Sequence, residues 1–154
     1  MTLPKPATRA PRQPKPIPRR ARVRKVRKST VAALRRKLWG LVAKYVRERD
    51  GHQCVTCPAH GVHAGHFYTR RIASTLFDPK NLGCQCETCN MYMQGNPGAF
   101  ADHIVSTYGP AELVRLTARA QIKKQWRADE LRMLIAAIQH DPAAFEMAYY
   151  EANL

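Results

Sequence analysis

The stretch Cys54-Val55-Thr56-Cys57 is separated by 28 residues from a second stretch of the same form, Cys86-Glu87-Thr88-Cys89. Two Cys-x2-Cys pairs supply four thiolates, which is the ligand set of a closed tetrahedral zinc site. Few large apolar side chains lie in this region, so the free energy of metal binding would have to stabilise it. The sequence therefore predicts a structural Zn2+ ion held by Cys54, Cys57, Cys86 and Cys89. A thiol–disulfide redox role for the two pairs is the alternative.

The segment between the two pairs is longer than the roughly 15–20 residues of an ordinary zinc ribbon, so it is expected to house an element of its own. It contains His63-Ala64-Gly65-His66 within a β-prone run, and Asn81 shortly before the second pair. The fifth cysteine, Cys84, is expected to be a small buried apolar residue rather than a fifth ligand.

A base and a cation are the two requirements for hydrolysing a phosphodiester. A neutral imidazole can serve as the base near pH 7, since its ordinary pKa is about 6.5. His66 is the candidate general base. Asn90, directly after Cys89, offers an amide oxygen to a second, divalent cation. We expect the zinc site to hold the two side chains on facing elements, close enough to act on one phosphate. The alternatives are a packing role for His66 and a helix N-cap for Asn90.

Three further residues have candidate supporting roles. Asn81 is expected to hydrogen-bond across the loop and keep His66 oriented; an ordinary turn residue is the alternative. Arg70 and Arg71 follow His66 closely and are candidates for binding phosphate oxygens, with solvated loop charges as the alternative.

This order of residues resembles the ββα-metal (His-Asn-His) nucleases, in particular the zinc-stapled branch that includes phage endonuclease VII. It is more similar to the lambda-type NinG/Rap family of recombination endonucleases, over roughly 95 residues. The residues that carry this second resemblance are Val46-Arg47-Glu48-Arg49-Asp50, Ala64-Gly65-His66-Phe67, Phe77 with Asn81, Cys86 and Cys89 with Asn90, and Gly95-Asn96.

The resemblance implies a structure-selective endonuclease that cleaves branched DNA such as Holliday junctions, with His66, Asn81 and Asn90 catalytic and Mg2+ or Mn2+ as the catalytic ion. One departure is notable. Many relatives in the superfamily have an acidic metal ligand directly before the base, where this chain has Gly65. His63 is one candidate for the missing ligand and Asp78 is the other. A His/Asn ligand set would favour Mn2+ or a softer ion.

Excess positive charge is concentrated at the N-terminus. Residues 1–37 contain 14 Lys or Arg and no acid, whereas residues 38–154 contain 12 basic and 11 acidic residues. Six prolines precede residue 19, and such a composition predicts a disordered arm over residues 1–28. A basic arm binds nucleic acid without sequence choice; a solubility tail is the alternative. The arm residues expected to bind DNA are Arg19, Arg20, Arg22, Arg24, Lys25, Arg27 and Lys28.

Apolar residues recur at helical spacing elsewhere. They predict a helix over residues 29–49 with Ser29 as its N-cap, and further helices beginning near Pro97, Pro110, Ala128 and Pro142. The predicted fold class is mainly α with a small zinc-stapled ββα-metal centre, residues 29–154 forming one nuclease domain. Met91 and Met93 are expected to face the core.

Neither a membrane span nor a secretory signal is recognisable, so we expect a cytoplasmic protein. Symmetric cleavage of a junction needs two active sites, so a homodimer is expected. Two other functions are open: a non-catalytic zinc-binding nucleic-acid-binding protein, and a less selective nuclease that nicks duplexes or flaps.

Overall fold

The computed structural model of the chain describes residues 30–153. The predicted basic arm and Ser29 lie outside the described residues. The elements follow in the order α1 (Val31–Arg49), β1 (His63–His66), η1 (Pro79–Asn81), β2 (Leu82–Gln85), η2 (Thr88–Tyr92), α2 (Pro97–Tyr108), α3 (Pro110–Ala120), α4 (Ala128–His140) and α5 (Pro142–Glu151). The fold is mainly helical with a small two-stranded sheet, as predicted.

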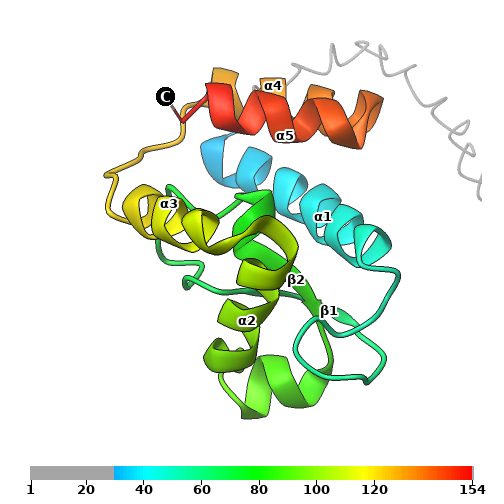
Figure 1. Cartoon of the computed structure of the whole chain (residues 1–154). Coiled ribbons are helices and arrows are strands. Elements are labelled where there is room, and N and C mark those ends of the chain that lie inside the picture. The colour runs from blue at the N-terminus through cyan, green and yellow to red at the C-terminus, as the bar shows by residue number, and fades with distance from the viewer. Residues whose placement is uncertain (1–29, 154) are drawn as a thin grey trace, which may run out of the picture.

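Helix α1 lies between two other layers. Figure 1 shows the α4–α5 pair on one side of it and the β1–β2 hairpin on the other. Its apolar face contributes Leu34, Leu38, Val42 and Val46 to the main core, together with residues of α4 and α5. Thr30 caps its N-terminus by accepting the backbone N–H of Ala33 at 3.3 Å, so the cap is one residue later than predicted.

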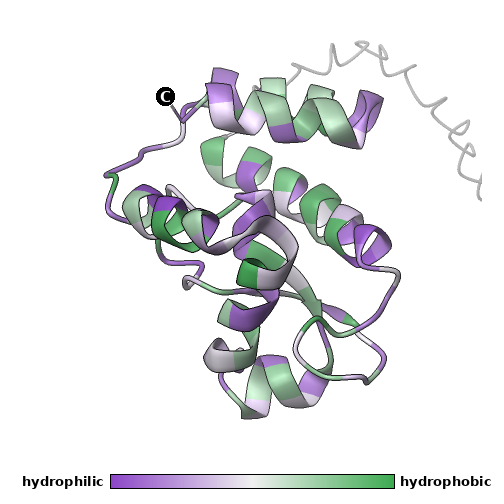
Figure 2. Ribbon diagram, viewed as in Figure 1, coloured by the Kyte–Doolittle hydropathy of each residue, from purple (hydrophilic) through white to green (hydrophobic). Residues whose placement is uncertain are grey.

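The apolar side chains of the helices are concentrated where the layers meet. Figure 2 shows green, apolar segments alternating with purple, polar segments along α1. The buried residues of α4 are Leu131, Leu134, Ile135 and Ile138. Helices α2 and α3 form a second, smaller core around Phe100, Ile104 and Leu116.

The hairpin has two chemically different faces. β1 and β2 pair antiparallel, with His63 opposite Gln85 and His66 opposite Leu82. Alternate residues of a strand point to opposite faces. Ala64 and Leu82 belong to the α1 core, so His66 shares that face. A Cβ atom at Gly83 would meet Val55 and Phe100, so the other face, with His63 and Gln85, is covered by α2 and the first cysteine pair.

The helix starts predicted at Pro97, Pro110, Ala128 and Pro142 are confirmed. Cys84 is fully buried, as predicted. Met91 and Met93 were wrongly predicted to face the core: they are 58% and 48% exposed, because the turn η2 carries them outward. None of the described helices combines the length and apolarity needed to cross a membrane.

Candidate functional site

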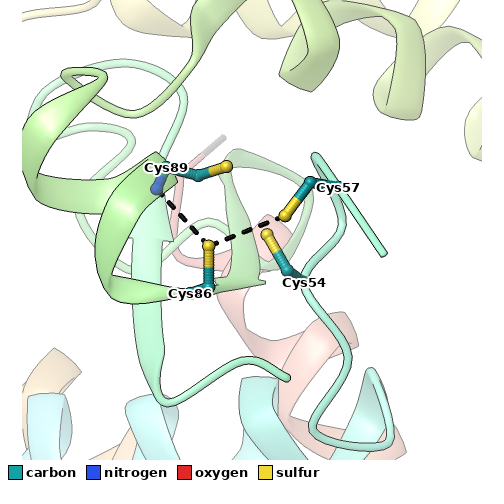
Figure 3. A group of neighbouring side chains, drawn as sticks. All are labelled: Cys54, Cys57, Cys86 and Cys89. Carbon is teal, nitrogen blue, oxygen red and sulfur yellow. Dashed lines mark hydrogen bonds between the residues drawn. The ribbon is translucent and has the colours of Figure 1, made fainter. Parts of the chain in front are cut away.

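The four cysteines of the two pairs converge. Their Sγ atoms all lie within 4.8 Å of one another, and those of Cys57 and Cys86 are 3.6 Å apart. Figure 3 shows the sulfurs pointing toward a common centre. A tetrahedral ion with Zn–S bonds of about 2.3 Å requires sulfurs at about this spacing. These four cysteines could therefore hold a metal ion such as zinc.

Asn96 borders this cysteine cluster. It occupies the N-cap position of α2, but its backbone is left-handed (φ 47°) and its side chain does not cap the helix. Its Nδ2 instead donates to the Sγ of Cys89 at 3.8 Å. A donor to a thiolate stabilises its negative charge, which explains the absence of a side-chain cap.

His66 is the last residue of β1, and its ring lies against α1. It stacks on Trp39 with the ring centroids 4.9 Å apart, and its Nε2 lies 3.2 Å from the carbonyl oxygen of Leu76. A carbonyl oxygen can only accept, so Nε2 carries the proton and Nδ1 carries the lone pair. The pKa of His66 is lowered to about 4, mainly because the ring is buried; the bond to Leu76 opposes this shift, and the nearby charge of Arg70 adds to it. The imidazole is therefore neutral at pH 7.

A pocket of about 460 Å3 opens beside this ring. Four guanidinium groups line it, two from α1 and two from the loop after β1. The lining residues are Arg35, Arg36, Trp39, His66, Arg70, Arg71, Leu76 and Phe77. The sequence pointed to Arg70 and Arg71 as phosphate-binding residues, but it did not identify Trp39. Arg35 and Trp39 are one helical turn apart and therefore lie on the same face of the helix. This spacing is the signal that could have identified Trp39 as a neighbour of the arginines.

Asn81 is fully buried and connects the two sides of the loop. Its Oδ1 accepts the N–H of Tyr68 at 2.7 Å, and its Nδ2 donates to the carbonyls of Tyr68 at 3.0 Å and Thr75 at 2.9 Å. Its backbone oxygen accepts the N–H of Phe67 at 2.8 Å. It thereby fixes the segment that leaves His66, the kind of bridge that the sequence suggested; a part in catalysis stays a prediction.

Asn90 lies within η2 and not at the start of a helix, where Glu87 is the N-cap residue. The N-cap alternative for Asn90 is therefore wrong. Its Oδ1 lies 3.1 Å from the point where a Cβ atom of Gly65 would stand. His63 has the parity of Gly65 and shares this face of β1. His63 and Asn90, the predicted ligands of the second cation, thus lie on one face of the hairpin.

From the sequence we expected His66 and Asn90 on facing elements, with their side chains close enough to act on one phosphate. The structure instead directs the two side chains to opposite sides of the hairpin. Gly65 and His66 are consecutive in β1, so their side-chain directions are opposite. Asn90 faces Gly65, whereas the His66 ring faces Trp39. The two groups flank the same dipeptide from opposite sides of the hairpin.

Asp78 is excluded as the missing acidic metal ligand, because protein groups already occupy its carboxylate. It is fully buried, accepts Arg119 Nε at 2.7 Å and Tyr150 Oη at 3.2 Å, and caps η1 through the N–H of Lys80. Within residues 30–153 the cysteines are the sole cluster of three or more His, Cys, Asp or Glu side chains placed to share a metal ion.

Arg49 and Asp50 form a clamp that sequence reasoning did not assign. Arg49 donates to the carbonyls of Pro79 and Leu82, each at 2.8 Å, and Asp50 accepts the N–H of Cys84 at 2.7 Å. The end of α1 is thereby attached to β2. Both residues belong to the run of residues 46–50, which is part of the resemblance to the NinG/Rap family. That run was the signal by which the sequence could have identified them.

Comparison with known proteins places this chain in a family. The family model described as "Bacteriophage Lambda NinG protein" matches residues 5–146. The protein ninG of Escherichia phage 933W is 27% identical over 103 residues, which are 64% of this chain and 51% of that protein. The protein ninG of Salmonella phage P22 is also 27% identical over 103 residues, 64% of this chain and 50% of its own length.

The chain thus spans about half the length of the curated relatives that it matches. No solved structure matches it. The family model, by contrast, covers nearly the whole chain. The protein therefore belongs to the NinG family, which is described by the NinG protein of bacteriophage lambda.

Proposed function

We propose that this protein is a metal-dependent endodeoxyribonuclease that hydrolyses phosphodiesters in branched recombination intermediates, such as Holliday junctions. One observation carries the proposal: a neutral imidazole, with its tautomer fixed by a backbone carbonyl, lines a pocket with four arginines. A base that is unprotonated at pH 7 beside an anion-binding surface is what attack by water on a phosphate needs.

His66 is the general base in this proposal. Its Nδ1 takes a proton from the attacking water, while the Nε2–H bond to Leu76 holds the ring in place. Arg70 and Arg71 bind nonbridging phosphate oxygens as charged donors, and Arg35 and Arg36 enlarge that surface from α1. Asn81 acts on the reaction through the loop that it fixes.

Asn90 and His63 are the proposed holders of the catalytic Mg2+ or Mn2+. An amide oxygen and an imidazole nitrogen on one face of β1 fit such an ion, with a preference for Mn2+. The ion would supply charge neutralisation at the phosphate and the leaving oxygen. Together with the cysteine cluster, β1, β2 and η2 correspond to a zinc-stapled ββα-metal centre in this proposal.

The placement of His66 and Asn90 on opposite faces imposes a condition on the substrate. The phosphodiester must pass across the end of β1, where His66 follows Gly65, so that one side of it meets the base and the other side meets the cation. A distorted or branched DNA backbone can follow this path more readily than a straight duplex, because it is already bent and needs less free energy for further deformation.

DNA binding is proposed to have two parts. The basic arm, residues 1–28, supplies sequence-independent affinity, and the pocket arginines position one phosphate. Residues 38–154 are nearly balanced in charge, so selectivity would depend on DNA shape rather than on a strongly basic body. Paired cuts in a junction need two such sites, and we propose a homodimer.

A non-catalytic zinc-binding nucleic-acid-binding protein is the second candidate. Two observations favour it: His66 and Asn90 do not share a face, and the described residues near Asn90 offer no cluster of carboxylates. A less selective nuclease that nicks flaps or duplexes is the third.

One assay separates the three. The purified protein is incubated with Mg2+ or Mn2+ and with synthetic four-way junction, flap and linear duplex DNA of equal length. Paired cuts that are restricted to the junction support the proposal. Cleavage of all substrates supports the less selective nuclease. Binding without cleavage of any substrate supports the non-catalytic protein and refutes our proposal.

A further inference from the structure

Gln85, the last residue of β2, has an oxygen with no partner. The side chain is fully buried, and its Nε2 donates to Gly95 O at 2.7 Å and to Thr56 Oγ1 at 3.2 Å. Because the carbonyl of Gly95 can only accept, the NH2 group must face it and the orientation of the amide is fixed. The Oε1 atom has no hydrogen-bond partner among the described residues. A buried acceptor left unpaired is costly, and an ion or an ordered water is the usual explanation.

This unpaired oxygen points at the notch left by Gly65. A Cβ atom at Gly65 would stand 2.0 Å from Gln85 Oε1 and 3.1 Å from Asn90 Oδ1. Two amide oxygens therefore converge on one small volume. His63 pairs directly with Gln85 across the hairpin, so its side chain leaves the sheet on the same face.

Two acceptor oxygens that face one space without a donor between them repel each other, and a cation placed between them removes that repulsion. We propose that Gln85 Oε1 is a ligand of the catalytic divalent cation, together with Asn90 Oδ1 and His63. This inference rests on the proposed function for the presence of that cation. Gln85 then supplies, from β2, the oxygen that a carboxylate before His66 would supply from β1.

The three donors carry no net charge, and this has a consequence for affinity. Affinity for Mg2+ or Mn2+ rises with the negative charge of the ligands, so the protein alone binds the ion weakly. A DNA phosphate brings the missing charge. Cation binding and DNA binding are therefore coupled, and each strengthens the other by the same factor.

The test measures Mn2+ binding by the electron paramagnetic resonance signal of the free ion. Full-length, zinc-loaded protein with His66→Ala is used, so that the DNA stays intact, with and without four-way junction DNA. We expect the DNA to tighten Mn2+ binding at least tenfold. Gln85→Glu keeps the length of the side chain and adds a charge, although it gives up the donation to Gly95; it should tighten binding without DNA about tenfold. Gln85→Leu should weaken binding at least tenfold.

Gln139→Glu is the matched control. Gln139 is exposed on α4, so this substitution adds the same charge far from the notch and should leave Mn2+ binding unchanged. If Gln85→Glu and Gln85→Leu both bind Mn2+ as the parent does, with unchanged zinc content and circular dichroism, the inference is wrong.

A second measurement needs no substitution at Gln85, in case its variants do not fold. Substoichiometric Mn2+ should broaden the side-chain amide NMR signals of Gln85 and Asn90 in the wild-type protein before other amide signals. Uniform broadening overturns the inference. Cleavage is assayed separately: activity without selective broadening refutes the Gln85 ligand alone, and selective broadening without activity refutes the nuclease alone.

Discussion

His66 combines two features that together fix the protonation state of its ring. Its ring is stacked on Trp39, which keeps water away from one face, and its Nε2–H is committed to Leu76. Both features keep the neutral form with Nδ1 free, which is the form that a general base needs. Packing alone would explain the stacking, so the test of a chemical role is a kinetic one.

Replacing His66 by Ala should reduce cleavage of junction DNA by about 10²–10⁴-fold, the usual contribution of a general base. The ring is half-buried at the edge of a pocket, so folding, zinc content and junction binding should be nearly unchanged. Single-turnover cleavage and an electrophoretic mobility shift measure the two effects. Wild-type cleavage by this variant would contradict the assignment of the base.

The pH dependence follows from the same burial. The pKa of His66 is lowered from 6.5 to about 4, so the base stays unprotonated down to about pH 4. The acidic limb of kcat/KM should therefore lie near pH 4 and not near 6.5. In the unfolded chain the ring gains a proton below about 6.5, so this group also makes the folded state less stable as the pH falls from 6.5 toward 4.

Trp39→Ala tests the cause of this shift. Removing the indole lets water reach the imidazole, so the His66 pKa and the acidic limb should both move up toward 6.5. NMR titration of the His66 ring and the pH–rate profile should move together. A limb that stays in place while the ring pKa rises would show that another group controls the rate.

At the scale of elements, the cysteine cluster joins the turn after α1 to β2 and η2. Cys86 and Cys89 are buried in a small cluster that contains no large apolar side chain, so a metal ion held by the four cysteines would be the main source of stability there. η2, which carries Asn90, is attached to the hairpin through Cys86 and Cys89.

Cys86→Ser should abolish zinc binding and unfold the region of residues 52–96. Cys84→Ala is the control, because Cys84 is buried but lies outside the four-sulfur cluster; it should keep its zinc. Zinc content by atomic absorption and amide hydrogen exchange across residues 52–96 measure the outcome. A stable, zinc-free Cys86→Ser protein would refute the structural role of the metal.

A buried charge network connects η1 to α3. Glu112, only 2% exposed at its side chain, accepts Lys80 at 3.0 Å, Arg115 at 2.9 Å and Arg119 at 2.8 Å. Burial pushes the pKa of Glu112 up, but the hydrogen bonds from these three cations outweigh it and lower the pKa to about 2. The carboxylate therefore stabilises the fold above about pH 4.5, and that contribution is lost as the pH falls toward 2.

Glu112→Gln should destabilise the protein by about 3 kcal/mol, because it leaves three cations around a buried neutral group. It should also flatten the loss of stability between pH 4.5 and 2. Glu48→Gln, at the exposed pair with Lys44, is the control and should cost less than about 1 kcal/mol. Urea denaturation across this pH range gives both values, and equal losses for the two variants would contradict the account of the network.

At the scale of the whole molecule, the net positive charge is unevenly distributed along the chain. The segment of residues 1–37 carries the net positive charge, and the segment that follows is nearly neutral. Affinity for DNA and selectivity for its shape are therefore expected to come from different parts of the protein.

Deleting residues 1–27 should weaken DNA binding and reduce the slope of log K against log salt concentration, because fewer counterions are released. Folding and zinc content should be unchanged. Binding isotherms at several salt concentrations measure the slope. Unchanged affinity would show that the arm does not bind DNA.

The sequence by itself determined the features that depend on local spacing. The spacing within each Cys-x2-Cys pair predicted that its two thiols belong to one cluster that could hold a metal, because two ligands on one short turn can point at a common centre. The prolines predicted where α2 and α3 begin, and the period of the apolar residues predicted α4. Each of these depends on residues a few positions apart.

The tertiary structure alone decided which element covers each face of the hairpin. The alternation of side chains along β1 places His66 and Gly65 on opposite faces. Only the packing of α1 on one face puts Trp39 beside His66, and only the packing of η2 on the other face puts Asn90 beside Gly65. The unpaired oxygen of Gln85 was likewise invisible in the sequence. The physical reason is that burial, pairing and pKa depend on groups far apart along the chain, and only the packed fold brings those groups together.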